Sequence, residues 1–469
     1  MSEYKIVLQE THANILRAHF FKEKNTELAA FITFGISNVT DGETGKQSTI
    51  FSSHAIELLS ASDLVSVSSS HVTWDNSKLI GAIKLAEASH LVIGVAHSHI
   101  VAPAQFSRVD DHGESELCAL LQNRNGKQIK LISLVFDKEG NIRARVWSSP
   151  KKQKPVSIVK TIGSRFGFYY DKQKSLHIPA LKRQALAFGD ALNSTLSRLS
   201  ITVVGCGGTG SAVAVLLARL GVGRINLIDP DKVDLSNLNR LHGATLKDAQ
   251  QKKLKVSVVG KHIESLGLKT QINKYPYSVT NAICRNVLKG SDFVFGCTDD
   301  NSGRVLLNRL AYFYAIPVID MGLAIELSNV GQLKVQALDG RVTVLVPSST
   351  CLLCRGVIDE RKARAEFLKA VNPKEFKRQK REAYVAGEGD PNPSVVTFTT
   401  EVATMAVNEL LHRITGYRGL FENTDQRTRL FHRMHDLRPG DLPRPDCPVC
   451  GDDFYWGRGD VEPFLDQIW

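Results

Sequence analysis

Apolar and polar positions along the chain follow two recurring patterns. The run LVIGVA at residues 91–96 is continuous and strand-sized, which is typical of a strand buried in a sheet. Residues 107–122 instead carry the spacing of a helix. From about residue 181, strand-like runs and helical stretches alternate to the C-terminus. This alternation predicts an α/β fold with a parallel, doubly wound sheet.

The same patterns divide the chain into three sections. Residues 1–150 alternate short apolar strands with two helical stretches, which predicts a first α/β domain. Residues 151–180 mix lysines with prolines and are expected to be a connector, and residues 181–469 form the second domain. A chain of 469 residues is too long for one ordinary hydrophobic core, which favours this division.

Composition and charge narrow the classes of function. The longest apolar runs are too short to cross a membrane, and the N-terminus lacks the basic-then-apolar pattern of a signal peptide. We therefore expect a cytoplasmic protein without a membrane partner. The net charge of +11 is concentrated in part at residues 360–382, which predicts a solvated helix or crossover segment. A nucleic-acid partner is not expected, because no aromatic RNA-binding motif is present.

A first chemical site is predicted where the strand at residues 90–99 ends in His-x-His. Side chains two residues apart on a strand point to the same face, so His97 and His99 project together. Ser107 begins the following helical stretch, and Asp110 lies one turn into it. Two imidazoles and a carboxylate would leave one position on zinc for water. The alternative is a plain helix cap, because Ser-x-x-Asp is also a capping pattern.

Such a site needs a general base, and Glu27 stands directly before an apolar strand. The complete arrangement resembles the JAMM (JAB/MPN) metalloproteases, whose signature is matched at Glu27, His97, His99, Ser107 and Asp110. The resemblance covers roughly residues 5–145 and implies a JAB/MPN α/β domain.

The resemblance also implies roles for these residues. The two histidines and Asp110 would bind a catalytic zinc, Glu27 would act as general acid/base, and Ser107 would steady the tetrahedral intermediate. Family members cleave peptide or isopeptide bonds just after the C-terminal glycine of ubiquitin or a ubiquitin-like protein. One departure is Ile100, which stands where the family usually has proline.

A second site is predicted at ITVVGCGGTG, residues 201–210, which reads as a strand, a glycine-rich turn and a helix. Glycines allow a tight turn and bring backbone amides to a phosphate at the helix N-terminus; they are Gly205, Gly207, Gly208 and Gly210. Asp229 ends the next strand, where an acid holds ribose hydroxyls. Dehydrogenases share these features, so an NAD-dependent oxidoreductase remains an alternative at this point.

The residues that follow distinguish the alternatives. Cationic and amide side chains near phosphates suit transfer at an α-phosphate, and a carboxylate suits magnesium. The candidates are Asp231, Asn237, Arg240, Lys253 and Asp299. A solvated loop charge is the alternative for each, and for Lys253 in particular because Lys252 and Lys255 are close by.

Residues 181–455 resemble the ubiquitin-activating and MoeB/ThiF adenylyltransferases, through Gly-x-Gly-Gly-x-Gly, Asp-x-Asp, Ser-Asn-Leu-x-Arg, a following lysine and Cys-Thr-Asp. The resemblance implies a Rossmann-like domain in which Asp229 contacts ribose and Asp299 binds Mg²⁺. Contacts to the phosphates of ATP would come from Asn237, Arg240 and Lys253. Arg183, beside Gln184, would reach across a homodimer into the ATP of the partner subunit. Gln250 departs from the family, which usually has glycine there.

The eight cysteines fall into two groups. Two Cys-x-x-Cys pairs in a cytoplasmic chain predict a structural zinc, held by Cys351, Cys354, Cys447 and Cys450. We expect the others to be packing residues: Cys118, Cys206, Cys284 and Cys297. Residues 355–446 contain no cysteine for the thioester of a ubiquitin-activating enzyme. A hydroxyl is the alternative acyl acceptor, among Ser394, Thr397, Thr399 and Thr400.

Together these features predict a fusion of two enzymes that share one substrate, similar to bacterial ubiquitin-like systems. A zinc (iso)peptidase would trim or release a ubiquitin-like protein at its C-terminal glycine, and an ATP-dependent domain would adenylate that C-terminus. The adenylate would pass to a conjugating enzyme, as in phage defence, or to a sulfur donor that makes a thiocarboxylate. A purely scaffolding first domain is the non-enzymatic alternative.

Overall fold

The computed structural model divides the chain into two compact units. The first contains Met1–Gln173, Phe313–Ala315 and Phe454–Pro463, and the second contains the remainder. The structure describes residues 3–23, 25–67, 72–74, 76–172, 178–327, 335–381, 393–419 and 423–461.

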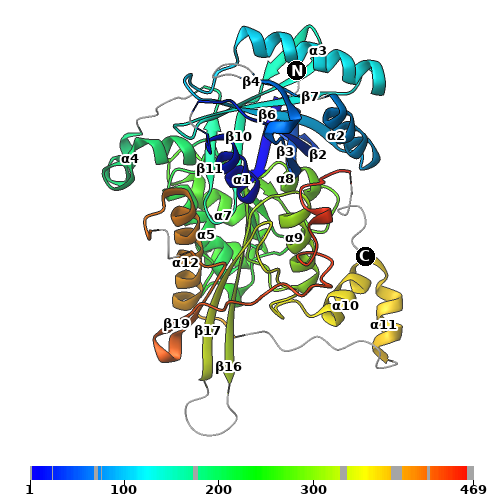
Figure 1. The fold of residues 1–469 in the computed structure, drawn as a ribbon. Coiled ribbons are helices and arrows are strands. Elements are labelled where there is room, and N and C mark those ends of the chain that lie inside the picture. Colours follow the sequence, from blue (N-terminus) through cyan, green and yellow to red (C-terminus); the bar gives the residue numbers. More distant parts are fainter. Residues whose placement is uncertain are drawn as a thin grey trace. The chain divides into compact units, whose positions relative to one another are not determined.

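A nine-stranded sheet forms the centre of the first unit, in the order β11-β10-β1-β3-β2-β6-β7-β8-β9 (Figure 1). Its strands are β1 (Glu3–Gln9), β2 (Ala29–Thr40), β3 (Gln47–Leu58), β6 (Val92–His99), β7 (Leu131–Asp137), β8 (Ile142–Ser149), β9 (Lys152–Pro155), β10 (Ile158–Ile162) and β11 (Gly167–Tyr170). Strands β4 (Leu64–Val67) and β5 (Val72–Trp74) make a separate pair. The helices are α1 (Glu10–Phe20), α2 (Asn76–Ala88) and α3 (Arg108–Asn125).

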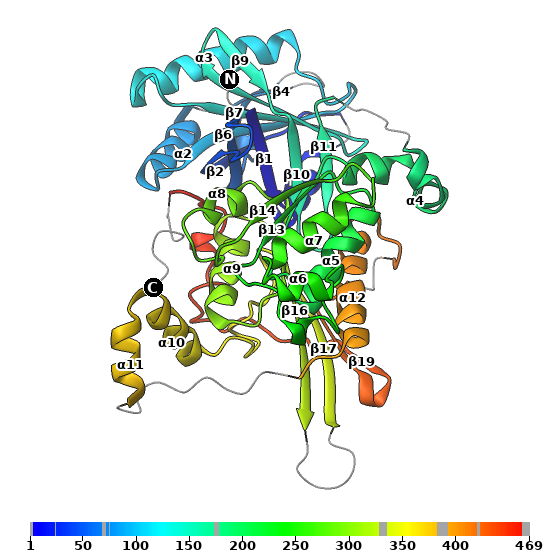
Figure 2. The same cartoon turned by 180° about the vertical axis from the view of Figure 1, so that it is seen from behind.

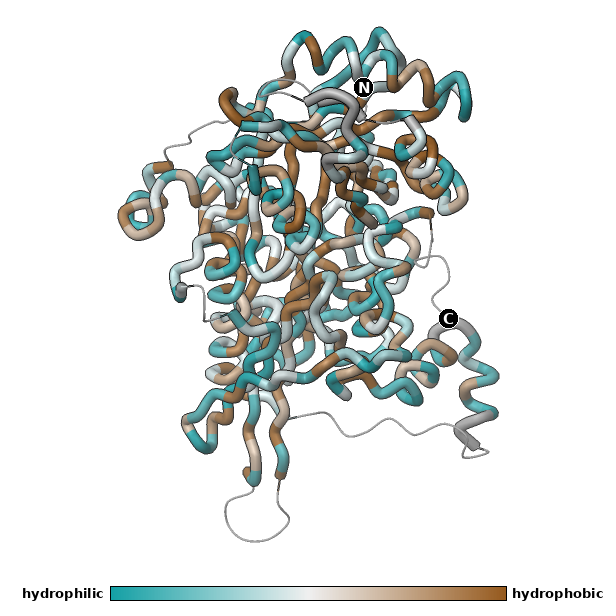
Figure 3. Tube along the Cα trace, viewed as in Figure 1, coloured by the Kyte–Doolittle hydropathy of each residue, from teal (hydrophilic) through white to brown (hydrophobic). Residues whose placement is uncertain are grey.

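Each face of this sheet carries its own hydrophobic core. Phe20 of α1 packs with Phe34, Phe51 and Phe136 of the strands on one face. On the other face, α2 and α3 supply apolar side chains that pack against Ile93 and Val95 of β6. Because alternate residues of a strand share a face, His97 and His99 lie on the side that α3 covers. The hydrophobic residues of the chain are concentrated along such strands (Figure 3).

The structure corrects the prediction that residues 151–180 form a connector. Residues 151–170 contain β9, β10 and β11, and all three belong to the sheet of the first unit. β10 pairs with β1 in parallel, with Lys5 opposite Ile158, and every residue of β10 is buried. The surrounding lysines made the segment resemble a linker. The hydrogen-bonding partner of β10 lies about 150 residues earlier, so no local pattern predicted the strand. The first unit therefore extends beyond residue 150, and it also includes Phe454–Pro463 from near the C-terminus.

An eight-stranded sheet forms the second unit, in the order β14-β13-β12-β15-β16-β17-β18-β19. The strands from β14 to β16 are parallel, as in a Rossmann-like fold, and those from β16 to β19 are antiparallel. The predicted parallel sheet thus accounts for only part of this mixed α/β unit. The strands are β12 (Ser200–Val204), β13 (Arg224–Ile228), β14 (Gln271–Tyr275), β15 (Phe293–Gly296), β16 (Val318–Leu327), β17 (Val335–Leu345), β18 (Gln426–Leu430) and β19 (His435–Leu437).

Helices pack against this sheet, and β16 and β17 extend beyond it as a long hairpin (Figure 2). The helices are α4 (Lys182–Leu196), α5 (Gly208–Arg219), α6 (Leu246–Gln250), α7 (Lys255–Glu264), α8 (Cys284–Lys289), α9 (Asn301–Phe313), α10 (Glu360–Val371), α11 (Pro373–Arg381) and α12 (Val396–Thr415). Within the described ranges, every helix is too short or too polar to span a bilayer.

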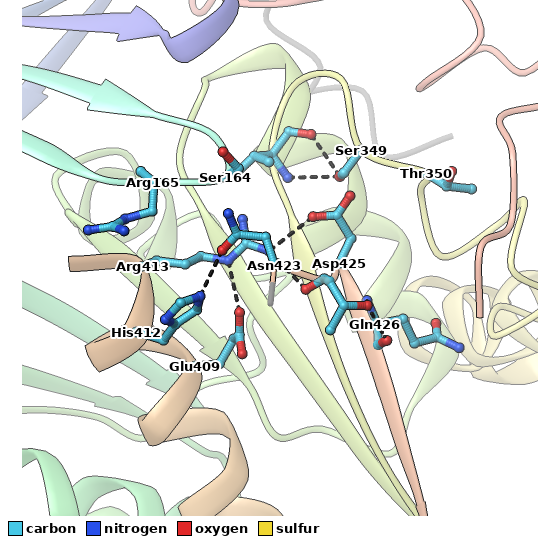
Figure 4. Close-up of polar contacts among 12 residues, drawn as sticks. Ser164, Arg165, Ser349, Thr350, Glu409, His412, Arg413, Asn423, Asp425 and Gln426 are labelled. Carbon is cyan, nitrogen blue, oxygen red and sulfur yellow. Dashed lines mark hydrogen bonds and ion pairs between the residues drawn. The ribbon is translucent and has the colours of Figure 1, made fainter. Parts of the chain in front are cut away.

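A buried cation anchors the C-terminal end of α12. Arg413 is fully buried, and its guanidinium lies 3.2 Å from Glu409 and 3.0 Å from Asp425 (Figure 4). It also donates to the carbonyl of Thr424 at 3.1 Å. A buried charge is tolerated only when it is paired and hydrogen-bonded, so these contacts hold α12 against the segment that precedes β18. The other end of α12 reaches the cavity described below.

Candidate functional sites

The first candidate site combines the end of β6 with the start of α3. The Nε2 atoms of His97 and His99 lie 3.3 Å apart. Asp110 places its Oδ1 at 3.2 Å from Nε2 of His97 and its Oδ2 at 3.6 Å from Nε2 of His99. The structure therefore brings together the three residues that the sequence nominated as catalytic metal ligands.

A helix cap sets the position of Asp110. The side chain of Ser107 accepts from the backbone N–H of Asp110 at 3.2 Å, and the carboxylate of Asp110 accepts from the backbone N–H of Ser107 at 2.6 Å. This reciprocal capping box begins α3. The two alternatives from the sequence are thus compatible, because the capping carboxylate is also the one that faces the histidines.

The spacing of these atoms fits a single zinc ion. Zinc bonds of about 2.0–2.1 Å at tetrahedral angles place ligand atoms roughly 3.3 Å apart, close to the separations observed here. Nδ1 of His99 lies 3.2 Å from the carbonyl oxygen of Pro103, so this nitrogen donates, and Nε2 is the atom that faces His97 and Asp110 and could bind a metal. Burial raises the pKa of Asp110, but hydrogen bonds from His97 and His99 outweigh it and hold that pKa well below its usual range.

Glu27 is a buried carboxyl beside this triad. It precedes β2, in which Ala29 pairs with His97. Ser98 joins the two strands, because its hydroxyl accepts from the N–H of Leu28 at 3.0 Å. Burial raises the pKa of Glu27, although the nearby His99 and His97 act to lower it. A carboxyl with a raised pKa suits proton transfer.

The second candidate site is a cavity of about 510 Å³ in the second unit. It lies at the carboxyl ends of β12, β13 and β15 and at the N-terminus of α5. Seven of the residues nominated from the sequence line it: Gly205, Gly207, Gly208, Asp229, Asp231, Arg240 and Asp299. Backbone N–H groups at a helix N-terminus favour an anion, and such a cavity edge suits a nucleotide.

The glycines at this edge serve different purposes. Gly205 has φ of 88°, a conformation that favours glycine. A Cβ on Gly210 would lie 1.8 Å from the carbonyl oxygen of Gly205, so Gly210 lets α5 approach the turn, and it does not line the cavity. A Cβ on Gly207 would meet open space. Gly207 and its neighbour Gly208 line the cavity at the start of α5, where their backbone can face a ligand.

Asp229 is fixed at the end of β13. Its carboxylate accepts from the N–H of Cys206 at 2.6 Å and from the N–H of Asp231 at 2.8 Å. Burial raises its pKa, partly offset by Lys255. The carboxylate is thus held in one orientation while it remains part of the cavity wall.

The lysine that the sequence nominated for ATP, Lys253, lies outside the residues that line the cavity. Its Nζ lies 2.8 Å from Asp248 and the side chain is 38% exposed. Lys255 lines the cavity instead, 13% exposed, with Nζ 2.7 Å from Asp231. The choice between them depends on where α7 begins, and that start is Lys255. Sequence spacing could not decide it within a lysine-rich stretch.

Two other nominated residues also lie outside the lining. The side chain of Asn237 accepts from the N–H of Asp234 at 3.0 Å in a capping box. Arg183 lies in the first turn of α4. Neither belongs to the described residues that line the cavity. Arg240 does, and its guanidinium donates to the carbonyl of Ser236 at 2.7 Å.

Adjacent carboxylates at the end of β15 have separate roles. Asp300 accepts from the hydroxyl of Ser302 at 2.8 Å and the N–H of Gly303 at 2.7 Å, which caps α9. Asp299 is exposed to the cavity and makes no hydrogen bond to the described part of the chain. It is the carboxylate available for a metal ion.

The segment before and within α12 forms part of the cavity wall. The sequence had suggested only that its hydroxyl groups are alternative acyl acceptors. Ser394 and Thr399 line the cavity, whereas Thr397 and Thr400 do not. Thr400 lies 3.1 Å from Nε2 of His242. Residues after β14, including Tyr277, also line the cavity and were missed, because no local motif marks them.

Four cysteines form a second metal-ligand cluster. Sγ of Cys351 lies 3.7 Å from Sγ of Cys447, and Sγ of Cys450 lies 3.6 Å from Sγ of Cys354. Zinc–sulfur bonds of about 2.3 Å at tetrahedral angles place sulfurs roughly 3.8 Å apart. The four sulfurs can therefore hold one zinc, as the sequence predicted.

The remaining cysteines are mostly core residues. Cys118, Cys206 and Cys284 are buried, and burial raises the pKa of each thiol, to about 12 for Cys284. Cys297 differs from the prediction of a simple packing residue, because it also lines the cavity. Its pKa is raised by burial as well.

Comparison with known proteins identifies a family match and several curated relatives of the chain. The profile of one family, described as the ThiF family, matches residues 181–449. The chain is 34% identical over 143 residues to an adenylyltransferase and sulfurtransferase (UBA4) of Meyerozyma guilliermondii, covering 30% of this chain and 32% of that protein. It is 32% identical over 124 residues to a sulfur carrier protein adenylyltransferase of Thermus thermophilus, covering 26% and 45%.

A third relative is a ubiquitin-like modifier-activating enzyme 5 of Dictyostelium discoideum, 27% identical over 172 residues, covering 34% of this chain and 42% of that protein. The chain thus spans about a third to a half of the length of these curated relatives. The profile match begins after the first 180 residues.

Proposed function

The chain belongs to the ThiF family, and from this premise we propose that the second unit adenylates the C-terminal carboxylate of a ubiquitin-like protein. The observation that carries the proposal is the cavity at the N-terminus of α5, with a ribose-binding type of acid at the end of β13 and a free carboxylate at Asp299. The printed names of the relatives point the same way, since they are adenylyltransferases or activating enzymes for sulfur carriers and ubiquitin-like modifiers.

The lining residues fit ATP and Mg²⁺. Gly207 and Gly208 would offer backbone N–H groups to phosphate, and Asp229 would accept from ribose hydroxyls. Arg240 and Lys255 would neutralise negative charge that develops at the α-phosphate, and Asp299 would hold magnesium. Attack by the substrate carboxylate on that phosphate releases pyrophosphate and leaves an acyl adenylate.

For the first unit we propose a JAMM-type zinc (iso)peptidase. His97, His99 and Asp110 would hold the zinc, which supplies a polarised carbonyl and an activated water when bound. Glu27 would take the proton of that water and pass it to the leaving amine, and Ser107 would steady the tetrahedral intermediate. The support is the match between the measured atom separations and tetrahedral zinc, together with the buried Glu27.

The two reactions can act on one substrate in succession. Cleavage exposes a C-terminal carboxylate, and adenylation consumes it, so covalent linkage raises the effective concentration of the shared substrate. We favour conjugation in the cytoplasm as the outcome, with a conjugating enzyme as the next partner, because an isopeptidase implies attached targets. Transfer to a sulfur donor is the second candidate, favoured by the absence of cysteine from residues 355–446.

A homodimer is part of the proposal. Leu186 of α4 is 81% exposed, and Phe188 meets Tyr417 edge to face with ring centroids 6.2 Å apart. Exposed apolar side chains of this kind mark contact surfaces. A second copy on this face would let Arg183, in the same helix, approach the cavity of the partner subunit.

The test uses the full chain with a ubiquitin-like protein encoded beside it that carries residues after its C-terminal glycine. Intact mass spectrometry follows trimming, and ATP–pyrophosphate exchange follows adenylation. We expect a shortened species that supports exchange. If neither trimming nor exchange were observed, that result would contradict the proposed substrate class.

A further inference from the structure

The loop of residues 100–106 joins the histidines to the capped helix. Pro103 turns its carbonyl oxygen toward Nδ1 of His99 at 3.2 Å, and the same oxygen accepts from the N–H of Gln105 at 2.7 Å. Ile100 and Ala104 are buried. The orientation of the His99 ring therefore depends on where this loop is held.

Asp137 holds it from the neighbouring strand. It ends β7 in register with His99 of β6 and is only 3% exposed. Its Oδ2 accepts from the N–H of Ala104 at 3.0 Å. The same carboxylate accepts from the N–H of Asn141 at 2.8 Å and from the side-chain amide of Asn141 at 2.9 Å.

These contacts divide into two groups with different consequences. Those to Asn141 close the turn between β7 and β8, which begins at Ile142, and they involve no part of the triad. The contact to Ala104 reaches the residue next to Pro103. A carboxylate satisfies all of these donors at once, whereas any apolar side chain would leave the buried N–H of Ala104 unpaired.

We propose that Asp137 is a positioning residue for the metal of the first unit: it holds Ala104, which fixes the Pro103 carbonyl at Nδ1 of His99 and leaves Nε2 directed at the metal. This inference rests on the proposed function, because it presumes that the triad binds zinc. Partners that orient a ligating histidine typically affect metal affinity by about 10- to 100-fold.

The experiment measures metal binding rather than cleavage. The full chain is treated with a chelator until only the four-cysteine zinc remains, then titrated with Co²⁺ while its visible absorption is recorded. We expect Asp137→Ala to weaken Co²⁺ binding about 10- to 100-fold and to shift the visible bands. Asp137→Asn keeps one oxygen for the N–H of Ala104, so it should restore much of the affinity for Co²⁺. This variant also covers the case in which Asp137→Ala fails to fold.

Asn141→Ala is the matched control, because it removes a partner of the same carboxylate but leaves the loop contact. It should bind Co²⁺ as the unaltered chain does. An unchanged affinity and spectrum in both Asp137 variants would overturn the inference, and so would an equal loss in Asn141→Ala. No uptake by the unaltered chain, matched by His97→Ala, would overturn the metal site of the proposed function and this inference with it.

Discussion

The two candidate sites are built on different scales. The two histidines of the first unit's triad are buried, Asp110 is partly exposed, and all the ligand atoms lie within 4.8 Å of one another. It comes from one strand end and the first turn of the next helix. The cavity of the second unit, about 510 Å³, collects residues from strand ends, loops and helices that are spread over nearly 200 residues of the chain.

The difference shows in how each site is positioned. In the triad a single carboxylate, that of Asp110, caps α3 and faces both histidines. In the cavity, neighbouring charges are already paired with one another, as Lys255 is with Asp231. A compact site leaves little freedom for its ligands, whereas a large one must exchange internal ion pairs for ligand contacts.

The largest expected effect separates the two sites by function. Glu27→Gln should lower cleavage about 10²- to 10⁴-fold, the typical contribution of a general base, while pyrophosphate exchange is kept. Asp299→Ala should do the converse, because the adjacent carboxylate of Asp300 is occupied at the cap of α9. Zinc content and both rates are measured on each variant, and exchange is measured with the ubiquitin-like protein already trimmed to its C-terminal glycine. Loss of both activities in either variant would show that the sites are not independent.

A pair of glycine variants tests whether the cavity holds a ligand at the start of α5. Gly207→Ala should fold normally, because φ of −78° is open to alanine and its Cβ meets no atom, yet it should weaken ATP binding about tenfold, or ~1.4 kcal/mol. Gly210→Ala should fail to fold the unit, since its Cβ would collide with Gly205. Calorimetric titration and thermal unfolding report the two effects. Normal ATP binding by Gly207→Ala would place the phosphates elsewhere.

Lys253 and Lys255 offer a sharper comparison between two neighbouring residues. Lys255→Ala should lower pyrophosphate exchange about 10- to 100-fold, because a hydrogen bond to a charged group contributes about 1.5–3 kcal/mol. Lys253→Ala removes a half-exposed ion pair with Asp248, which contributes about 0–1 kcal/mol to stability, and should leave exchange nearly unchanged. Exchange rates at saturating ATP distinguish them. The opposite ranking would restore the assignment made from the sequence.

The smallest expected effect comes from Ser107 variants, which separate its role as the cap of α3 from its proposed role in cleavage. Ser107→Ala should destabilise the first unit by about 1 kcal/mol through loss of the cap, and it should also slow cleavage. Ser107→Asn keeps a capping side chain but lacks the hydroxyl, so it should retain stability and still slow cleavage. Denaturant unfolding and cleavage rates are compared. If cleavage follows stability in both variants, Ser107 acts only as a cap.

Local chemistry was readable from the sequence by itself. The His-x-His spacing and the Ser-x-x-Asp cap each lie within a few residues, so strand and helix geometry determine how their side chains point. The glycine-rich turn at residues 201–210 was predictable for the same reason. The two Cys-x-x-Cys pairs were also readable, but their sulfurs meet across 96 residues of chain, and the tertiary structure brings them together. These features specified the metal ligands and one edge of the cavity.

Only the tertiary structure decided the long-range features. Whether Lys253 or Lys255 reaches the cavity depends on the start of α7 and its pairing with Asp231. β10 depends on β1, far earlier in the chain, for hydrogen bonds. The role of Asp137 depends on register between β6 and β7. Such choices arise from packing and pairing between distant segments, which no local pattern of residues encodes.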